Sequence, residues 1–131
     1  MPYWQKIVMI VCLTAIVLGL IHEKCYPAEI ITASYYTRES CLREGTSGIM
    51  ANGKELKDEA FTCASWDHAF GSKLRVYNLR TGESVVCVVS DRGPNRKLYR
   101  QGRKIDLSKA AFNKIAPLRE GVIPVRIEVI R

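Results

Sequence analysis

The sequence lacks the residues and patterns from which metal sites, nucleic-acid surfaces and multidomain chains are usually built. Its 131 residues include two histidines, and neither lies at ligand spacing from the cysteines, so we expect no metal and no cofactor. It has no internal repeat, linker or low-complexity tract, which indicates one small domain. It also lacks a basic-aromatic series and any nucleic-acid-reading motif, so no nucleic-acid partner is predicted despite the net charge of +7.

A long apolar run is also missing, because the longest one, residues 7–21, is too short for a simple membrane span. Fifteen residues rise about 22 Å as a helix, whereas roughly 20 residues are needed to cross a bilayer. Lys6 precedes the run, which is typical of a secretory signal, and Ala28 would be a suitable last residue before cleavage. We predict a signal peptide over 1–28, with an uncleaved anchor as the alternative, and contact with a membrane only through this segment.

Export changes the interpretation of the five cysteines. Cys12 and Cys25 lie in or beside the leader, which leaves three cysteines in an oxidising compartment. Cys87 lies inside an apolar run and is expected to be a small core residue. Cys41 and Cys63 lie in polar segments that are rich in turns, so we predict a disulfide between them.

The rest of the chain reads as mostly β. Alternation predicts strands over 30–36, 74–77 and 125–129, and the β-branched run 85–89 predicts a strand buried on both faces. Polar turns fill 37–59, and residues 81–83 join two strands in a hairpin. Ser108 is placed to cap the one convincing helix, which Pro117 ends.

Asp91 stands where the buried strand 85–89 reaches the surface, just before the turn at Gly93. A carboxyl group in this position is partly desolvated, and burial favours the protonated form that a general acid needs. Asp91 could instead only bind the turn amides around Gly93, a common role for Asp at a strand end. A basic stretch, residues 96–104, follows, and the whole segment resembles a site for a polar substrate.

The chain contains seven short motifs: 33–36 (ASYY), 50–53 (MANG), 61–64 (FTCA), 70–76 (FGSKLRV), 78–79 (NL), 90–94 (SDRGP) and 102–108 (GRKIDLS). Their order and spacing resemble the rare-lipoprotein-A (RlpA)-like family over roughly residues 32–131. The resemblance implies a six-stranded double-psi β-barrel over 29–131, a fold shared with expansins. It also implies an exported protein of the periplasm or cell envelope that cuts peptidoglycan glycan strands as a lytic transglycosylase, with Asp91 as acid and base.

The chain departs from the family pattern at two positions. Active members carry a catalytic His where this chain has Ser65, and an acidic residue where it has Lys54. Glu55 could take the acidic role after a shift of one residue, and Ser65 can bind a sugar but cannot carry protons near neutral pH. We expect Ser65, Glu55, Asn52 and Arg92 to contact substrate.

Three functions therefore remain open from the sequence. The first is a lytic transglycosylase that acts through Asp91 on MurNAc-GlcNAc strands and releases 1,6-anhydro products. The second is an expansin-like module that binds or loosens the wall without cutting it, as the loss of the His and of the acidic residue would suggest. The third is an inhibitor-like barrel that binds another protein. Asp106 is expected to brace the barrel, His68 to be an ordinary loop residue, and the protein to be a monomer.

Overall fold

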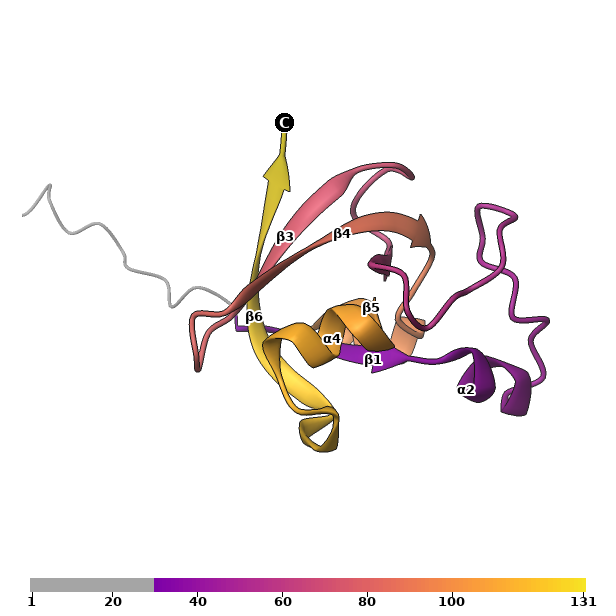
Figure 1. Cartoon of the computed structure of the whole chain (residues 1–131), viewed down its shortest axis with the longest axis horizontal. Coiled ribbons are helices and arrows are strands. Elements are labelled where there is room, and N and C mark those ends of the chain that lie inside the picture. Colours follow the sequence, from indigo (N-terminus) through magenta and orange to yellow (C-terminus); the bar gives the residue numbers. More distant parts are fainter. Residues whose placement is uncertain (1–29) are drawn as a thin grey trace, which may run out of the picture.

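The computed structural model describes residues 30–131, and within them six strands close into a single barrel (Figure 1). The strands follow one another around the barrel in the order β1-β5-β2-β4-β3-β6. The predicted leader, with its apolar run and the alternative anchor, lies outside the described residues. Among residues 30–131, no helix has the length and apolar character needed to cross a membrane.

Short helices lie between some of the strands. The strands are β1 (Ile31–Tyr36), β2 (Thr62–Ser65), β3 (Lys73–Asn78), β4 (Ser84–Asp91), β5 (Arg103–Ser108) and β6 (Val122–Ile130). The helices are α2 (Arg38–Arg43), α3 (Arg96–Arg100), α4 (Lys109–Ile115) and the 3-10 turn η1 (Leu118–Glu120).

Two parallel strand pairs give the barrel its topology. β1 pairs with β5 and β2 pairs with β4 in parallel, whereas the other four neighbouring pairs are antiparallel. Parallel neighbours require long connections, because a tight hairpin can only reverse the chain. The predicted mostly β, six-stranded barrel with a short helix is therefore confirmed.

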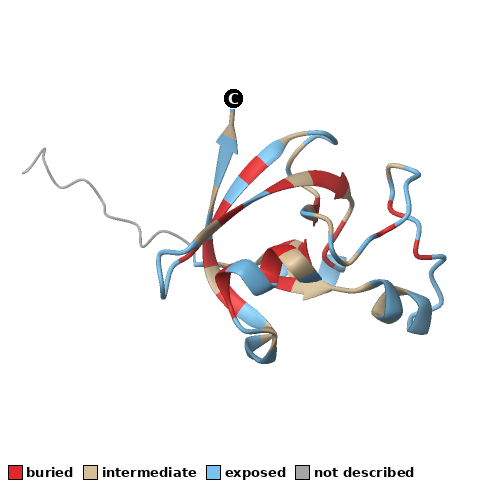
Figure 2. Cartoon of the chain, in the orientation of Figure 1, coloured by how far each residue is buried: buried red, intermediate tan, exposed pale blue. Residues whose placement is uncertain are grey.

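The core lies inside the barrel and is filled by alternate residues of the strands (Figure 2). β4 shows the pattern: Val85, Cys87 and Val89 are buried, while Val86 is 37% exposed. The prediction that this strand is buried on both faces is wrong, because in a closed barrel only the inward-facing residues meet the core.

Helix α4 covers one side of the core. Ser108 caps it, as predicted, with its side chain accepting a hydrogen bond from the Ala111 amide, and the helix ends before Pro117. Its buried residues are Ala111, Phe112 and Ile115, and the Phe112 ring lies 4.9 Å from that of Tyr35. This face joins α4 to the barrel core.

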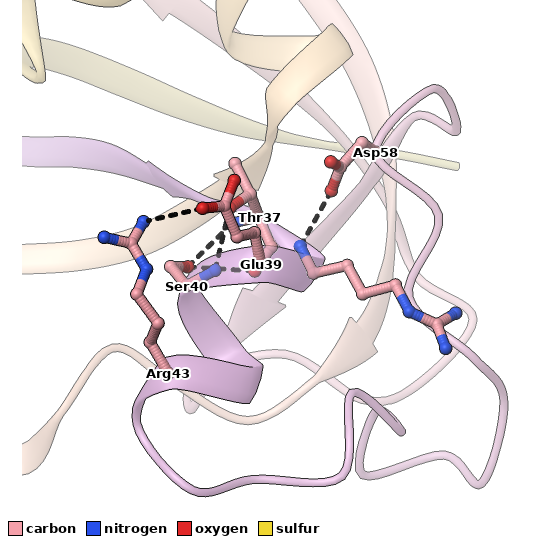
Figure 3. Close-up of polar contacts among 6 residues, drawn as sticks. Thr37, Glu39, Ser40, Arg43 and Asp58 are labelled. Carbon is pink, nitrogen blue, oxygen red and sulfur yellow. Dashed lines mark hydrogen bonds and ion pairs between the residues drawn. The ribbon is translucent and has the colours of Figure 1, made fainter.

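Helices α2 and α3 and strands β2 and β5 were not predicted from the local sequence. Helix α2 starts in the polar segment, where Thr37 and Ser40 form a reciprocal capping box with backbone-to-side-chain distances of 3.0 Å (Figure 3). The Arg38 amide also donates to the Asp58 carboxylate at 2.8 Å, which ties the helix to the loop after it. Capping replaces the apolar periodicity that a buried helix would show, and α2 has no buried residue.

The predicted disulfide between Cys41 and Cys63 is wrong, because Cys41, Cys63 and Cys87 are all free thiols in this structure. Cys63 is not in a polar turn but on β2, where its side chain is fully buried. Two effects raise the pKa of the Cys63 thiol: the larger is its hydrogen bond with the Cys87 thiol, and the second is burial. Cys41 lies on α2 and is only partly buried. The two residues thus belong to different environments, one inside the barrel and one at its surface.

Differential alkylation should separate these thiols. We expect slow modification of Cys41 in the folded protein, because its side chain is only partly buried but burial raises the pKa of its thiol. Cys63 and Cys87 are fully buried, so they should not react until denaturant is added. Peptide mapping with one reagent before unfolding and an isotopic form after it measures this. A Cys63 peptide labelled in the folded state, or two cysteine peptides joined by a disulfide, would contradict the arrangement.

Candidate functional site

A cleft of about 500 Å³ opens at the end of β4 that carries Asp91. Its walls come from β1, α2, the turn after β4 and β5, so residues far apart in the sequence meet here. Polar side chains on these walls include Ser34, Tyr36, Asp91 and Asp106. We call this the carboxyl cleft.

Asp91 is held in place by the backbone. Its Oδ1 atom accepts hydrogen bonds from the Ala51 and Arg92 amides, both at 2.8 Å. The turn beyond it packs closely, since a Cβ on Gly93 would lie 3.3 Å from the Cβ of Ala64, and this favours glycine. Asp91 therefore does bind backbone amides, as in the structural role considered above, and these bonds fix its carboxylate at the cleft wall.

Asp106 supplies a second carboxyl group to the same cleft. It lies on β5 opposite Ser34 of β1, and the Ser34 hydroxyl donates a hydrogen bond to Asp106 Oδ1. Burial raises the pKa of Asp106, whereas the Ser34 hydrogen bond and the Arg103 charge lower it, and the Asp91 charge adds to the rise. Asp106 thus holds its proton to higher pH than an exposed aspartate does.

The raised pKa of Asp106 predicts a pH effect on stability. The folded protein binds this proton more tightly than the unfolded chain, so the free energy of unfolding should fall as the pH rises from about 4 through the raised pKa. Asp106→Asn has no proton to lose, so its unfolding free energy should vary less across that window. Urea unfolding at a series of pH values measures this, with Asp67→Asn, an exposed aspartate outside the cleft, as control. Parallel pH curves for wild type and Asp106→Asn would contradict the prediction.

Tyr36, at the end of β1, brings a phenol to the cleft. Burial, and after it the charge of Asp91, raises the pKa of Tyr36, which keeps the phenol protonated. Its hydroxyl is buried, and among the described residues it has no hydrogen-bond partner in good geometry. A protonated donor beside Asp91 is therefore available to a ligand or to the carboxylate itself.

Arg92 lines the cleft, but its guanidinium group is engaged elsewhere. Nη1 donates to the carbonyls of Ser65 and His68 at 2.7 and 2.6 Å, and the group lies 3.9 Å from the centre of the Phe70 ring. None of the ion pairs among residues 30–131 joins Arg92 to Asp91. Arg92 therefore braces the loop after β2 instead of neutralising Asp91.

Ser65, where a substrate contact was predicted, is 1% exposed and lines neither of the two cavities described in this section. Its hydroxyl lies 3.1 Å from His68 Nδ1 and accepts a hydrogen bond from the Asp67 amide at 3.2 Å. The structure thus places Ser65 under the surface, in a loop that also holds His68.

A second cavity, of about 810 Å³, lies beside the carboxyl cleft and contains the other two predicted contacts, Asn52 and Glu55. Asn52 Oδ1 accepts from the Lys54 amide at 3.0 Å, and Gly53 takes the positive φ of 87° that this turn requires. Glu55 is paired with Arg38. We call this cavity the lysine groove, after Lys54 and Lys57, which line it together with Phe61 and Phe70.

The residues of the carboxyl cleft that were not assigned to the site from the sequence include Ser34, Tyr36 and Asp106. The available signal was an acid between two apolar residues, in Ile105-Asp106-Leu107, which is unusual in a core strand. Among the described residues, no cluster of three or more His, Cys, Asp or Glu side chains could hold a metal ion.

Comparison with known proteins places the chain in a family. A family model described as lytic transglycolase matches residues 28–127. A probable endolytic peptidoglycan transglycosylase RlpA from Nostoc sp. is 41% identical over 99 residues, which cover 75% of this chain and 24% of the relative. The chain therefore spans about a quarter of the length of that relative.

Solved structures share the fold at lower identity. Streptomyces papain inhibitor superposes with a TM-score of 0.58 at 24% identity, over 78% of this chain and 93% of the other. A mutant of the Clavibacter michiganensis expansin, in complex with cellohexaose, gives a TM-score of 0.53 at 21% identity, over 79% of this chain and 50% of that one. At these identities the likeness shows the fold alone.

Proposed function

The chain belongs to the lytic transglycolase family of RlpA-like double-psi β-barrels, and on that basis we propose that it cleaves the glycan strands of peptidoglycan. The observation that carries the proposal is the meeting of Asp91 and Asp106 in one cleft, within the residues that the family model matches. The bond cut is the one between MurNAc and GlcNAc.

The proposed reaction needs only proton transfers. A protein group protonates the glycosidic oxygen, and the bond from that oxygen to C1 of the muramic acid breaks. The C6 hydroxyl of the same sugar forms the new bond to C1 and gives up its proton, which yields a 1,6-anhydro end. One proton is donated and one is accepted, so neither a metal nor a water molecule enters the balance.

The two carboxyl groups divide these steps according to their surroundings. Asp106 suits the acid step, because burial raises its pKa and keeps its proton in place. Asp91 suits the base step, because two amides hold its Oδ1 as hydrogen-bond acceptor at the cleft wall. From the sequence, both steps were assigned to Asp91 alone. Tyr36 stands beside Asp91 as a hydrogen-bond donor.

The cell envelope is the proposed place of action, since the substrate lies there. We keep the prediction that residues 1–28 direct export, that any contact with a membrane is made by this segment, and that the barrel works as a monomer. Sequencing the N-terminus of the protein recovered from the envelope should show a start near Glu29. A start at Met1 in the membrane fraction would favour the anchor.

A binding module that does not cut is the second candidate. It is favoured by Ser65, which is buried and cannot shuttle protons, and by Lys54 in the neighbouring groove. The test is incubation of the full chain with purified glycan strands stripped of their peptides, with products identified by mass. New fragments with anhydro ends support the enzyme, and binding without new fragments supports the module.

A further inference from the structure

Strand β1 brings one hydroxyl group to each of the two carboxyl groups in the carboxyl cleft. Ser34 and Tyr36 are two residues apart, so they lie on the same face of the strand, whereas Tyr35 between them packs against the core. The Ser34 hydroxyl donates to Asp106. The Tyr36 hydroxyl lies at the end of the strand, within reach of the Asp91 charge. The two hydroxyls thus occupy corresponding positions, one for each carboxyl group.

The two oxygens of Asp91 are used differently by the protein. Oδ1 accepts hydrogen bonds from the Ala51 and Arg92 amides, both at 2.8 Å. An ionised carboxylate offers about four lone-pair sites on its two oxygens, and these two amides occupy the pair on Oδ1. Oδ2 is therefore the atom of Asp91 with room for a further hydrogen bond and for the proton of a substrate hydroxyl.

The Tyr36 hydroxyl is close to Asp91, but its hydrogen bond is incomplete. Burial is the largest cause of the raised pKa of Tyr36, the Asp91 charge comes next, and a hydrogen bond with Asp91 also contributes. Within residues 30–131 the buried hydroxyl nevertheless has no partner in good hydrogen-bond geometry. Buried polar groups in folded proteins rarely lack a partner. Hydrogen bonds of catalytic groups often tighten only when the substrate is bound, and a donor left incomplete beside Asp91 fits such a contact.

The other charged groups of the cleft do not take this place. No ion pair within residues 30–131 joins Asp91 to a cation, and the guanidinium group of Arg92 is bound to carbonyls of the loop after β2. Apart from Asp91 and Tyr36, the ionisable side chains that line the cleft are Tyr35, Cys41, Glu44, Arg92, Arg103 and Asp106. Tyr36 is thus the side chain placed to add a hydrogen bond to those from the two amides.

We propose that Tyr36 is a positioning residue for Asp91: its hydroxyl donates to Oδ2 and turns the other lone pair of that oxygen toward the C6 hydroxyl of the bound sugar. The proposal rests on the proposed function. In the base step the C6 hydroxyl gives its proton to Oδ2 while its oxygen forms the bond to C1. Tyr36 keeps its own proton throughout, so it orients the base and stabilises its charge without changing the proton balance.

Tyr36→Phe keeps the ring and removes the hydroxyl. We expect kcat to fall about tenfold with KM nearly unchanged, because the lost hydrogen bond goes to a charged protein group and not to the substrate. The hydroxyl favours the charged form of Asp91, so without it the rise of kcat with pH should move upward by about one pH unit. Rates of anhydro-fragment release from peptide-free glycan strands by the full chain, measured from about pH 4 to 8, give both quantities.

Tyr77→Phe is the matched control. It removes a hydroxyl that donates to Glu128 at 3.1 Å, outside the cleft, and should change neither kcat nor the pH profile. A Tyr36→Phe variant with the kcat and pH profile of the wild type overturns the proposal. So does a loss of rate that is equal at every pH, which indicates a structural role, or a rise in KM alone, which indicates a substrate contact.

Carbon-13 NMR of the Asp91 carboxyl carbon follows the same proton without requiring cleavage. Its titration midpoint should lie about one pH unit higher in Tyr36→Phe than in the wild type. A higher midpoint in a chain whose wild type cuts no glycan would reject the proposed function but keep the contact between Tyr36 and Asp91. Cleavage by the wild type, with the same midpoint in both proteins, would keep the function and reject the role of Tyr36.

Discussion

Asp91→Asn and Asp106→Asn should each lower the rate of glycan cleavage by about 10²–10⁴-fold and leave glycan binding nearly unchanged. Asparagine keeps the shape of each side chain but can neither donate nor accept the reacting proton. Ser34 can still donate to the side-chain oxygen at position 106, and the Ala51 and Arg92 amides to that at position 91, so the walls of the cleft should persist.

Asp67→Asn serves as the control, because Asp67 is exposed and lines neither the cleft nor the groove. Initial rates of fragment release and a separate binding titration distinguish chemistry from affinity. Full activity in Asp91→Asn would remove Asp91 from the site. Full activity in Asp106→Asn alone would return both proton transfers to Asp91, as the sequence had suggested.

Phe112→Ala should destabilise the domain by about 3–5 kcal/mol, a large part of the total stability of a typical domain. Phe112 is fully buried, packs against Tyr35 and is the largest side chain with which α4 closes the core. Its removal leaves a cavity that a closed barrel has little freedom to fill.

Phe61→Ala removes the same atoms from an exposed position and should cost less than about 1 kcal/mol. Urea unfolding of the two variants beside the wild type measures the difference. Equal losses would mean that α4 does not cover the core as described.

The barrel could be predicted because several independent patterns agreed with it. Alternation marked the strands ending near Tyr36, beginning near Leu74 and running through Ile127, and Ser108 marked the start of α4. The run 85–89 was misleading, since β-branched residues on both faces suggest a two-sided strand, yet Val86 faces solvent in the closed barrel. α2 and α3 were missed because helices of six and five residues without buried side chains carry no periodic signal.

The site was only partly predictable for a topological reason. Asp91 was found because it ends a recognisable strand. Asp106 was expected only to brace the barrel. Its place in the cleft depends on the parallel pairing of β5 with β1, which sets it opposite Ser34, 72 residues earlier in the chain. Likewise, no local pattern shows that Cys63 faces Cys87 or that Ser65 is buried, since both follow from how β2 is inserted between β4 and β5.

Cleavage of peptide-free glycan strands by the full chain in water enriched in heavy oxygen tests the central claim most directly. If Asp91 and Asp106 direct the C6 hydroxyl onto C1, each cleavage creates one 1,6-anhydro end, the other fragment keeps the glycosidic oxygen as its new hydroxyl, and neither new end takes up heavy oxygen. Mass spectrometry of the fragments reads both features at once. Reducing ends that carry heavy oxygen and lack the 1,6-anhydro bridge would show that water is the nucleophile and would contradict the mechanism proposed for this cleft.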